Sequence, residues 1–258
     1  MLKFLLKSAI WAVEQSLNTP ERKGARGERK VHNALAAVLD GTEYKVFSDL
    51  IIPADGGTSQ IDHLIISRFG IFVIETKNMS GWIFGGADQP KWTQVQKGGK
   101  RLSFQNPIFQ NYAHLRSLEA IFRVKKEILH NFVVFTGSAE PKTEMPFNVA
   151  WGLEDLGRLI GKNRTEVLSE TDVQNCVNTL QQKALENTKA VRKEHLNNIQ
   201  KNAAKKVKNP PEMFTPTDDG RSCPKCGAEM IKRVNRKTHE FFWGCTRFPK
   251  CKFTQKAP

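Results

Sequence analysis

The chain carries the sequence QIDHLIISRFGIFVIETK at residues 60–77, in which two apolar runs flank a short turn. Runs of β-branched and aromatic residues on both sides of a turn predict an antiparallel hairpin, with Ser67 paired to Gly70. In that register Asp62 lies opposite Glu75. Directly opposed residues have Cβ atoms about 4.5 to 5.5 Å apart, close enough for two carboxylates to share one hard cation. The hairpin therefore predicts a central piece of sheet that carries a pair of acids.

Lys77 extends this pattern. Because side chains alternate along a strand, Glu75 and Lys77 point to the same face, and Lys77 is expected beside the two acids. Two alternatives stay open. A register slip of one residue would move Asp62 to the opposite face, and a Glu-x-Lys pair on a strand is often an ordinary ion pair.

The segments on either side predict an α/β domain in which helices cover a sheet. Upstream, residues 26–39 have the apolar periodicity of a helix, and residues 44–53 are rich in strand-forming residues. Downstream we expect a hairpin at 81–95, a helix that begins after Asn106-Pro107, a strand at 130–136, a short helix at 154–159 and a long helical stretch at 171–208.

Two of these helices carry polar residues that could face the acids. Glu28 falls on the apolar stripe of residues 26–39, where an ionisable group needs a partner or suffers a raised pKa. Gln110 and His114 are four residues apart and share one face of the later helix. Each residue taken singly is more often structural, but the combination predicts one polar site.

Basic residues are concentrated toward the C-terminal end of the 258-residue chain. We count 22 Lys and Arg against 18 Asp and Glu up to Glu170, and 18 against 8 from Thr171 onward. Such a charge attracts polyanions such as nucleic acid or anionic lipid, because neutralised phosphates release condensed counterions. A solvated basic face is the simpler alternative, and the charge does not bear on catalysis.

Four of the five cysteines lie in two pairs, Cys223 with Cys226 and Cys245 with Cys251. Four thiolates satisfy tetrahedral Zn²⁺, and a module of about forty residues builds too small a core to fold without such help. We therefore predict a structural zinc site, with a disulfide pair or unrelated thiols as the alternative. Cys176 stands alone and is expected to be a buried apolar residue.

Metal-ligating cysteines indicate a reducing compartment, so we expect a cytoplasmic protein. No apolar run reaches the roughly 18 to 20 residues that cross a bilayer, and no cleavage site of small residues follows the apolar segment at the N-terminus. That segment, residues 1–21, could be an amphipathic helix on a membrane surface or a helix docked on the core.

Four short motifs occur between residues 24 and 114. They are Gly24-Ala-Arg-Gly-Glu28, Gln60-Ile-Asp62-His63, Ile74-Glu75-Thr-Lys77-Asn78, and Asn106-Pro107 with Gln110. Together they resemble the NERD domain, the nuclease-related domain of the PD-(D/E)xK phosphodiesterase superfamily. The resemblance covers under half of the chain and implies a restriction-endonuclease-like fold.

The resemblance also implies roles for the site residues. Glu28, Asp62 and Glu75 would be the acids beside a metal, and Lys77 the catalytic lysine. Gln110 would match the helix glutamine of the RecB-like branch, in which a tyrosine usually stands four residues later; His114 stands there instead, and its role is open. Oxygen donors favour Mg²⁺ or Mn²⁺, one ion or two, which activates water and stabilises the charge on phosphorus.

The C-terminal sequence FWGCTRFPKC at residues 242–251 resembles the zinc fingers of bacterial type IA topoisomerases. The resemblance implies binding of single-stranded DNA, with bases stacked on aromatic rings between cationic contacts to phosphates. The candidate contacts are Arg233, Arg236, Lys237, Phe241, Trp243, Arg247, Phe248, Lys252 and Phe253. Some of these rings must instead pack the small core of the ribbon.

The sequence thus predicts an α/β, restriction-endonuclease-like mixed sheet flanked by helices, then a helical connector and a small zinc ribbon. The expected boundaries are 1–21 for the apolar segment, 22–165 for the nuclease-like domain, 166–210 for the basic connector and 218–258 for the ribbon. The leading functional interpretation is a metal-dependent nuclease that hydrolyses DNA phosphodiester bonds. The alternatives are a non-catalytic DNA-binding or repair accessory protein that retains the fold, and an adaptor on a membrane surface.

Overall fold

The computed structural model describes residues 20–55, 57–186, 188–203, 222–228, 230–234, 241–245, 247–248 and 250–256. The apolar segment at 1–19, the polar linker before the cysteines, and Arg236 and Lys237 lie outside the described residues, so the expectations about them stay predictions. Within the described part of the chain, no helix has the length and apolar character needed to cross a membrane.

A five-stranded mixed sheet forms the centre of the larger module, in the order β1-β2-β3-β7-β9. Its strands are β1 (Tyr44–Ala54), β2 (Gly57–Ser67), β3 (Gly70–Lys77), β7 (Leu129–Phe135) and β9 (Val149–Trp151). The first three pair antiparallel, whereas β7 and β9 add to the sheet in parallel. Ser67 pairs with Gly70, so the predicted register of the hairpin is confirmed.

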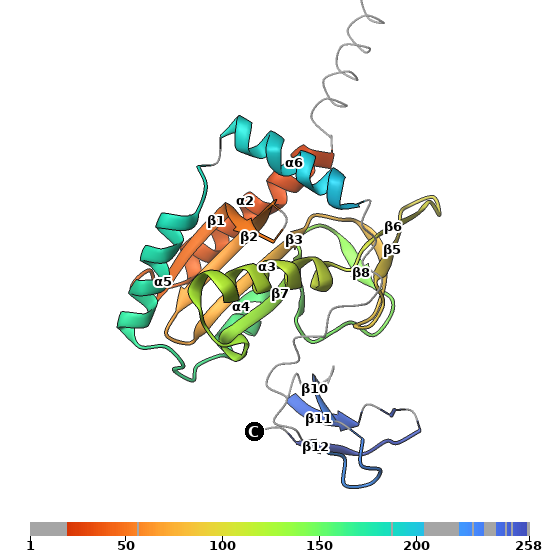
Figure 1. Cartoon of the computed structure of the whole chain (residues 1–258). Helices are drawn as coiled ribbons and strands as arrows, with labels where there is room; N and C mark the ends of the chain where they lie inside the picture. Colours follow the sequence, from red (N-terminus) through yellow and green to blue (C-terminus); the bar gives the residue numbers. More distant parts are fainter. Residues whose placement is uncertain are drawn as a thin grey trace, which may run out of the picture.

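Helices cover both faces of this sheet (Figure 1). They are α2 (Pro20–Val38), α3 (Pro107–Phe122), α4 (Leu153–Gly161) and α5 (Glu170–Lys183). Because side chains alternate along β3, Ile71 and Val73 pack in one apolar cluster with α3 and α5. Phe72 and Ile74 pack in a second cluster with α2 and α4. The predicted fold class, a mixed sheet flanked by helices, is confirmed.

A second sheet of four strands, in the order β6-β5-β4-β8, follows β3 in the chain. Its strands are β4 (Gly81–Phe84), β5 (Lys91–Val95), β6 (Arg101–Gln105) and β8 (Ala139–Pro141). Ile83 and Trp92 are fully buried in one cluster with Val133 and Phe135 of β7. The hairpin predicted at 81–95 is confirmed. The strands β6, β8 and β9 were not predicted, because their pairing partners, more than their own residues, make these segments strands.

The helical stretch predicted at 171–208 is broken in the structure. α5 ends at Lys183, and α6 (Lys189–Ala203) begins after an extended segment. In that segment the Leu185 N–H donates to the Ile51 carbonyl at 2.8 Å, which attaches the chain to the edge strand β1. α5 buries Val173 and Leu180 beside α3, so it packs as part of the larger module. Whether residues 166–210 also connect the two modules functionally stays a prediction.

The C-terminal residues form a small antiparallel sheet in the order β10-β11-β12 (Figure 1). Its strands are β10 (Met230–Val234), β11 (Phe241–Cys245) and β12 (Thr254–Lys256). The described core of this ribbon consists of Met230, Trp243 and buried cysteines. Such a core is small, so most of the folding free energy of the ribbon must come from a source other than apolar burial.

Candidate functional site

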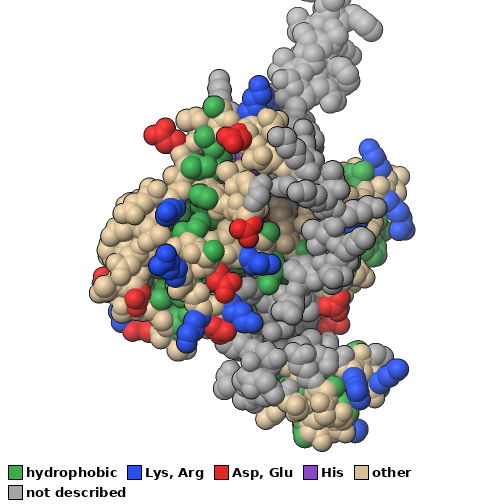
Figure 2. All heavy atoms as spheres, in the orientation of Figure 1, with side chains coloured by type: hydrophobic (Ala, Val, Ile, Leu, Met, Phe, Trp, Pro, Cys, Tyr) green, Lys and Arg blue, Asp and Glu red, His purple; other side chains and the backbone are tan. Residues whose placement is uncertain are grey.

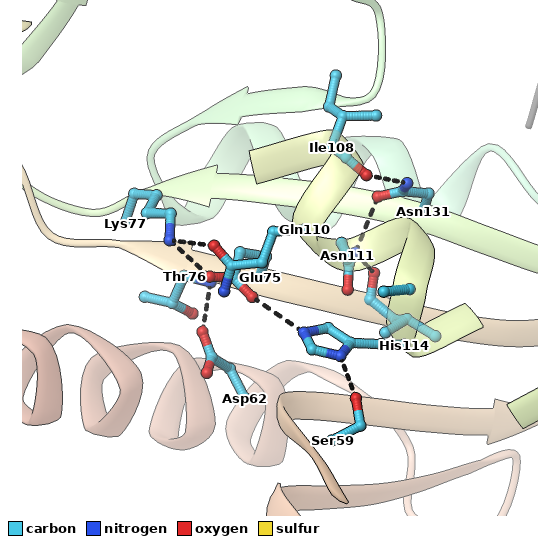
Figure 3. A network of polar contacts seen from close by, with 12 residues as sticks. Ser59, Asp62, Glu75, Thr76, Lys77, Ile108, Gln110, Asn111, His114 and Asn131 are labelled. Carbon is cyan, nitrogen blue, oxygen red and sulfur yellow. Dashed lines mark hydrogen bonds and ion pairs between the residues drawn. The ribbon is translucent and has the colours of Figure 1, made fainter. Parts of the chain in front are cut away.

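The candidate site lies where β3 ends beside α3 (Figure 3). The Lys77 Nζ donates to Glu75 Oε1 at 2.6 Å and to Gln110 Oε1 at 3.0 Å. Glu75 is only 3% exposed. Burial opposes its ionisation, but the charge of Lys77 and the contacts of His114 outweigh burial and lower the pKa of Glu75. Glu75 is thus held as an anion, with Lys77 as its counter-ion.

Asp62 reaches the same place through its side chain. The pairing of β2 with β3 stops at His63 and Ile74, and Asp62 Oδ2 then accepts a hydrogen bond from the Thr76 N–H at 2.8 Å. Burial, followed by the negative charge of Glu75, raises the pKa of Asp62 well above its usual value. The two acids come together as the sequence predicts, but Asp62 caps the end of β3 instead of forming a ladder pair with Glu75.

Glu28 approaches the site from α2. Burial raises the pKa of Glu28, and the charges of Asp49 and Glu75 add to this effect, whereas Arg192 and Lys77 oppose it. Glu28 therefore belongs to the same group of charges as the acids of the sheet.

A close approach of α2 to the end of β3 positions Glu28. The Asn78 Nδ2 donates to the Lys23 carbonyl at 2.6 Å, and a Cβ built on Gly27 would lie 2.7 Å from the Cβ of Asn78. Only glycine leaves room for this contact. The first and third motifs of the sequence are therefore physically joined.

His114, whose role the sequence left open, faces Glu75. Its Nε2 lies 3.8 Å from Glu75 Oε2, and its Nδ1 lies 2.5 Å from the Ser59 hydroxyl oxygen (Figure 3). All three residues are buried. Ser59 therefore fixes the ring on one side, and the ring sits against the oxygen of Glu75 that Lys77 does not bind.

Asp49 joins the acidic group, and reasoning from the sequence missed it. Its φ of 54° is unusual for a residue with a side chain, and the ladder between β1 and β2 is interrupted where Asp49 stands opposite Asp62. The Gln60 Nε2 donates to Asp49 Oδ1 at 2.8 Å, and Arg192 of α6 forms an ion pair with Oδ2. The sequence feature that could have identified Asp49 is the position of its carboxylate within the apolar run at 44–53.

A buried amide network holds α3 against the sheet (Figure 3). The Asn111 Nδ2 donates to the Val73 carbonyl at 2.8 Å and to Asn131 Oδ1 at 2.8 Å. The Asn131 Nδ2 in turn donates to the Ile108 carbonyl at 3.0 Å. These bonds join α3 to β3 and β7, and they fix the position of α3, with its site residues, along the strands. Neither asparagine was singled out from the sequence.

The donor set of this site is made of carboxylate oxygens, which suit Mg²⁺ or Mn²⁺ better than Zn²⁺. Glu28, Asp62 and Glu75 are near enough to alter one another's pKa. Within the described residues, however, only the cysteine sulfurs form a group of three or more potential ligand atoms that all lie within 4.8 Å of one another. Glu28, Asp62 and Glu75 would have to converge further for all three to bind one ion.

The four cysteines of the ribbon do converge. Cys223 Sγ lies 3.7 Å from Cys251 Sγ, and Cys226 Sγ lies 3.4 Å from Cys245 Sγ. A tetrahedron with Zn–S bonds of about 2.3 Å has edges of about 3.8 Å, so the sulfurs are placed for zinc. The Ala228 N–H lowers the pKa of Cys226 to about 7, whereas burial raises that of Cys245 to about 12. The predicted structural Zn²⁺ site is confirmed in its geometry.

The structure shows which of the described side chains proposed to contact DNA are exposed on the ribbon and which are buried in its core. Trp243 is 5% exposed and packs in the ribbon core, so its ring is not placed to stack on a base, which corrects that expectation. Phe253 is partly buried against the same core, whereas Phe248 is 56% exposed. Arg247 and Lys252 are exposed as expected. The side chains of Arg233 and Phe241, like Arg236 and Lys237, lie outside the described residues.

Two family models match the chain. Residues 23–136 match the nuclease-related domain, NERD, and residues 220–258 match the topoisomerase DNA-binding C4 zinc finger. The first match contains Glu28, Asp62, Glu75, Lys77 and Gln110, and the second contains the four clustered cysteines. The chain therefore has a region similar to a nuclease-related domain and, after it, a region similar to a topoisomerase-type zinc ribbon.

Individual relatives match in parts. An uncharacterized protein of Bacillus anthracis is 42% identical over 103 residues, which is 40% of this chain and 48% of that protein. DNA topoisomerase 1 of Mycoplasma genitalium is 35% identical over 57 residues, 22% of this chain and 7% of the enzyme. DNA topoisomerase 1 of Pyrococcus horikoshii is 50% identical over 32 residues, 12% of this chain and 5% of the enzyme. The chain thus spans half or less of these relatives. No solved structure matches it.

Proposed function

We propose that the chain is a metal-dependent nuclease that hydrolyses DNA phosphodiester bonds at the Glu75–Lys77 site. The observation that carries the proposal is the contact of Lys77 with the buried Glu75 and with Gln110, inside the region that matches a nuclease-related domain. An ion pair kept away from solvent in this way costs desolvation, which argues for a use other than stability.

In this proposal Asp62 and Glu75 hold Mg²⁺ or Mn²⁺, and Glu28 completes the acidic shell. The raised pKa values of Asp62 and Glu28 fit such a role, because a cation would favour the ionised carboxylates. When bound, the ion supplies an activated water and neutralises charge on phosphorus. Lys77 orients the attacking water or stabilises the developing charge, and Gln110 keeps the ammonium group in place.

The ribbon holds the DNA in this proposal, with a preference for single strands. The relatives that match the ribbon are named as DNA topoisomerases, and the matching family is described as DNA-binding. The exposed ring of Phe248 and the exposed Arg247 and Lys252 supply a stacking surface with cationic neighbours. A reducing, cytoplasmic compartment, in which the thiolates stay available for Zn²⁺, remains part of the proposal.

A second function is favoured by one observation. Among the described residues, no three carboxylates lie as close together as the ribbon cysteines do, and one oxygen of Asp62 already accepts the Thr76 N–H. A protein that binds DNA without cutting it would need no further convergence. The alternative is therefore a DNA-binding or repair accessory protein built on a nuclease fold.

The two functions are separated by cleavage of labelled single- and double-stranded DNA with Mg²⁺ or Mn²⁺. We expect Glu75→Gln and Lys77→Ala each to lower the cleavage rate roughly 100-fold or more, while DNA binding persists. Arg158→Ala, which breaks the exposed ion pair with Asp155, is the control and should cut at the normal rate. Binding without cleavage in every metal tested would favour the accessory protein.

Loss of activity must be separated from loss of folding. Lys77→Ala leaves the buried carboxylate of Glu75 without its counter-ion, which is destabilising by itself. The double variant Glu75→Gln with Lys77→Met removes both charges at similar volume. A double variant that unfolds at the normal temperature and remains inactive would assign the loss to chemistry.

A further inference from the structure

One face of the second sheet carries an exposed tryptophan among cations. The register places Trp82 of β4, Val95 of β5 and Arg101 of β6 in one row across three strands. Directly paired residues share a face, and so does Lys91, four residues before Val95 on β5. The opposite face carries the buried Ile83 and Trp92. The row therefore points away from the core.

Trp82 is 50% exposed, although Trp92 on the same sheet is completely buried. The Lys142 Nζ lies 5.0 Å from the centre of the Trp82 ring. Glu140, which pairs with Trp82 in the row, binds the same ammonium group at 2.9 Å, so its charge is compensated. An aromatic ring left in water beside a cation has the chemistry of a stacking platform.

The turn of the β5–β6 hairpin adds two more cations, Lys97 and Lys100, which are exposed like Arg101 at the start of β6. Gln96 N–H donates to the Lys100 carbonyl at 2.8 Å, which closes the turn. The hairpin projects from the body in Figure 1, and Figure 2 shows Lys and Arg side chains gathered at its end. No Asp or Glu occurs between residues 89 and 118 of the sequence, so nothing in the hairpin itself offsets these charges.

In the sequence, the strands that form this face lie between two segments that supply residues of the candidate site. β4 begins four residues after Lys77, and β6 ends two residues before α3, which carries Gln110. A strand of nucleic acid bound to the second sheet would be held by the same segment of chain that supplies the lysine and the glutamine of the site.

We propose that this outward face, formed by Trp82, Lys91, Lys97, Lys100, Arg101 and Lys142, binds single-stranded DNA independently of the zinc ribbon. The ring of Trp82 stacks on a base, and the cations contact phosphates on either side of it. The inference rests on the proposed function for the identity of the ligand, and it adds a second binding surface, on the nuclease-like module itself.

Site-resolved footprinting tests the surface in the full-length chain. Lysine acetylation is measured by peptide mass spectrometry with and without oligo(dT), at low salt and without a divalent metal. Lys97 and Lys100 should lose reactivity on binding, whereas Lys125 and Lys126, exposed on the same module, should not. Protection confined to lysines of the ribbon would overturn the proposal.

Variants give a second, independent measurement. Trp82→Ala should weaken oligo(dT) binding roughly 5- to 100-fold, as expected for one stacked base. Leu102→Ala removes an exposed apolar side chain from the opposite face and is its control. The pair Lys97→Ala and Lys100→Ala should lower the salt slope of binding by about 1.4, while Lys125→Ala with Lys126→Ala leaves it unchanged.

The outcomes separate this inference from the proposed nuclease. Unchanged affinity and salt slope in the hairpin variants would exclude the surface and leave the nuclease proposal standing. Reduced binding by the hairpin variants of a protein that cuts no DNA would support the surface and reject the nuclease.

Discussion

Gly27 is a residue at which α2 comes close to Asn78, at the end of β3. Its missing side chain lets α2 pass beside Asn78, which binds the Lys23 carbonyl and so fixes the position of Glu28. The sequence showed this glycine only as part of a motif. The structure supplies the reason, which is a backbone approach that no other residue permits.

We expect Gly27→Ala to destabilise the fold by about 1 to 3 kcal/mol and to lower nuclease activity, because the new Cβ pushes α2 and Glu28 away from the sheet. Urea unfolding and DNA cleavage measure the two effects. Gly157→Ala is the control, since a Cβ added to this glycine of α4 would meet no other atom within 4 Å. It should gain about 0.5 to 1 kcal/mol of stability from helix propensity. Equal stability of the two variants would contradict the close approach.

His130 is a single residue that should make the stability of the fold depend on pH. Its ring stacks on Phe72 with centroids 4.6 Å apart, and burial lowers its pKa to about 4. The unfolded chain, with a histidine pKa near about 6.5, then binds more protons than the folded protein between about pH 4 and 6.5. Stability contributed by the neutral ring is therefore complete above that window and is lost as the pH falls through it.

We expect the wild-type protein to lose roughly 3 kcal/mol through His130 between pH 6.5 and 4, a change that His130→Phe should abolish. The free energy of unfolding in urea is measured for both proteins at several pH values. Subtracting the two curves removes the contribution of His63, whose pKa burial also lowers to about 4. Parallel curves would show that His130 titrates normally in the folded protein.

At the scale of elements, α3 is held to the sheet by polar bonds as well as by apolar packing. Asn111 is fully buried and donates to the Val73 carbonyl and to Asn131. These bonds allow α3 only one position along the strands. Apolar packing alone would tolerate a sliding helix, because it has no direction. The hydrogen bonds fix which helix residues face Lys77 and Glu75.

Asn111→Leu should destabilise the protein by about 2 to 4 kcal/mol although leucine is more apolar, because it leaves a carbonyl and an amide buried without partners. Thermal unfolding measures the loss. Asn163→Leu is the comparison, since the Asn163 side chain donates to the Leu159 carbonyl at the partly exposed end of α4, and its loss should cost less than about 1 kcal/mol. Equal losses would mean that the network adds nothing beyond one hydrogen bond.

The helices α5 and α6 differ in how they attach. α5 buries apolar residues in the main core, whereas none of the α6 residues whose side chains the structure describes belongs to an apolar cluster. His195 Nδ1 lies 2.9 Å from the Thr58 hydroxyl oxygen, and Arg192 pairs with Asp49. An element held mainly by exposed or partly exposed polar bonds opens at lower free energy than one held by a core. Arg192 lowers the pKa of Glu28, and this effect therefore depends on a helix that opens more easily than α5.

On the scale of the whole molecule, the two modules have separate sources of stability. The described apolar clusters of the larger module include residues from 31 to 180, and the ribbon cluster consists of residues from 223 onward. No described cluster is shared. The larger module has buried sheet and helices, while the ribbon has three short strands and four cysteines.

Removing zinc with a strong chelator should therefore unfold the ribbon and leave the larger module intact. Hydrogen exchange should increase throughout residues 222–256 and stay unchanged in β2 and β3, because the metal supplies the folding free energy of the ribbon alone. Cys226→Ser should give the same pattern without chelator, and Cys176→Ser, at the buried cysteine outside the ribbon, should not. Loss of protection in both modules would show that they fold as one unit.

The sequence by itself determined what short-range patterns can carry. The apolar runs and the turn in residues 60–77 predicted the hairpin, Asn106-Pro107 predicted the start of α3, and the spacing of four cysteines predicted the zinc site. The structure chose between the expected register of the hairpin and a slip of one residue. These patterns act over a few residues, where backbone geometry and turn chemistry leave few choices. The single helix expected at 171–208 was wrong because pairing of Leu185 with β1, distant in sequence, interrupts it.

Only the tertiary structure decided which residues join the acids. Asp49 and Arg192 come from β1 and α6, and the ion pair between them links residues more than a hundred positions apart. The structure likewise decided that Trp243 packs the ribbon core while Trp82 stays in water. No local pattern encodes these outcomes, because the pKa of an acid and the exposure of a ring depend on every element that folds against them.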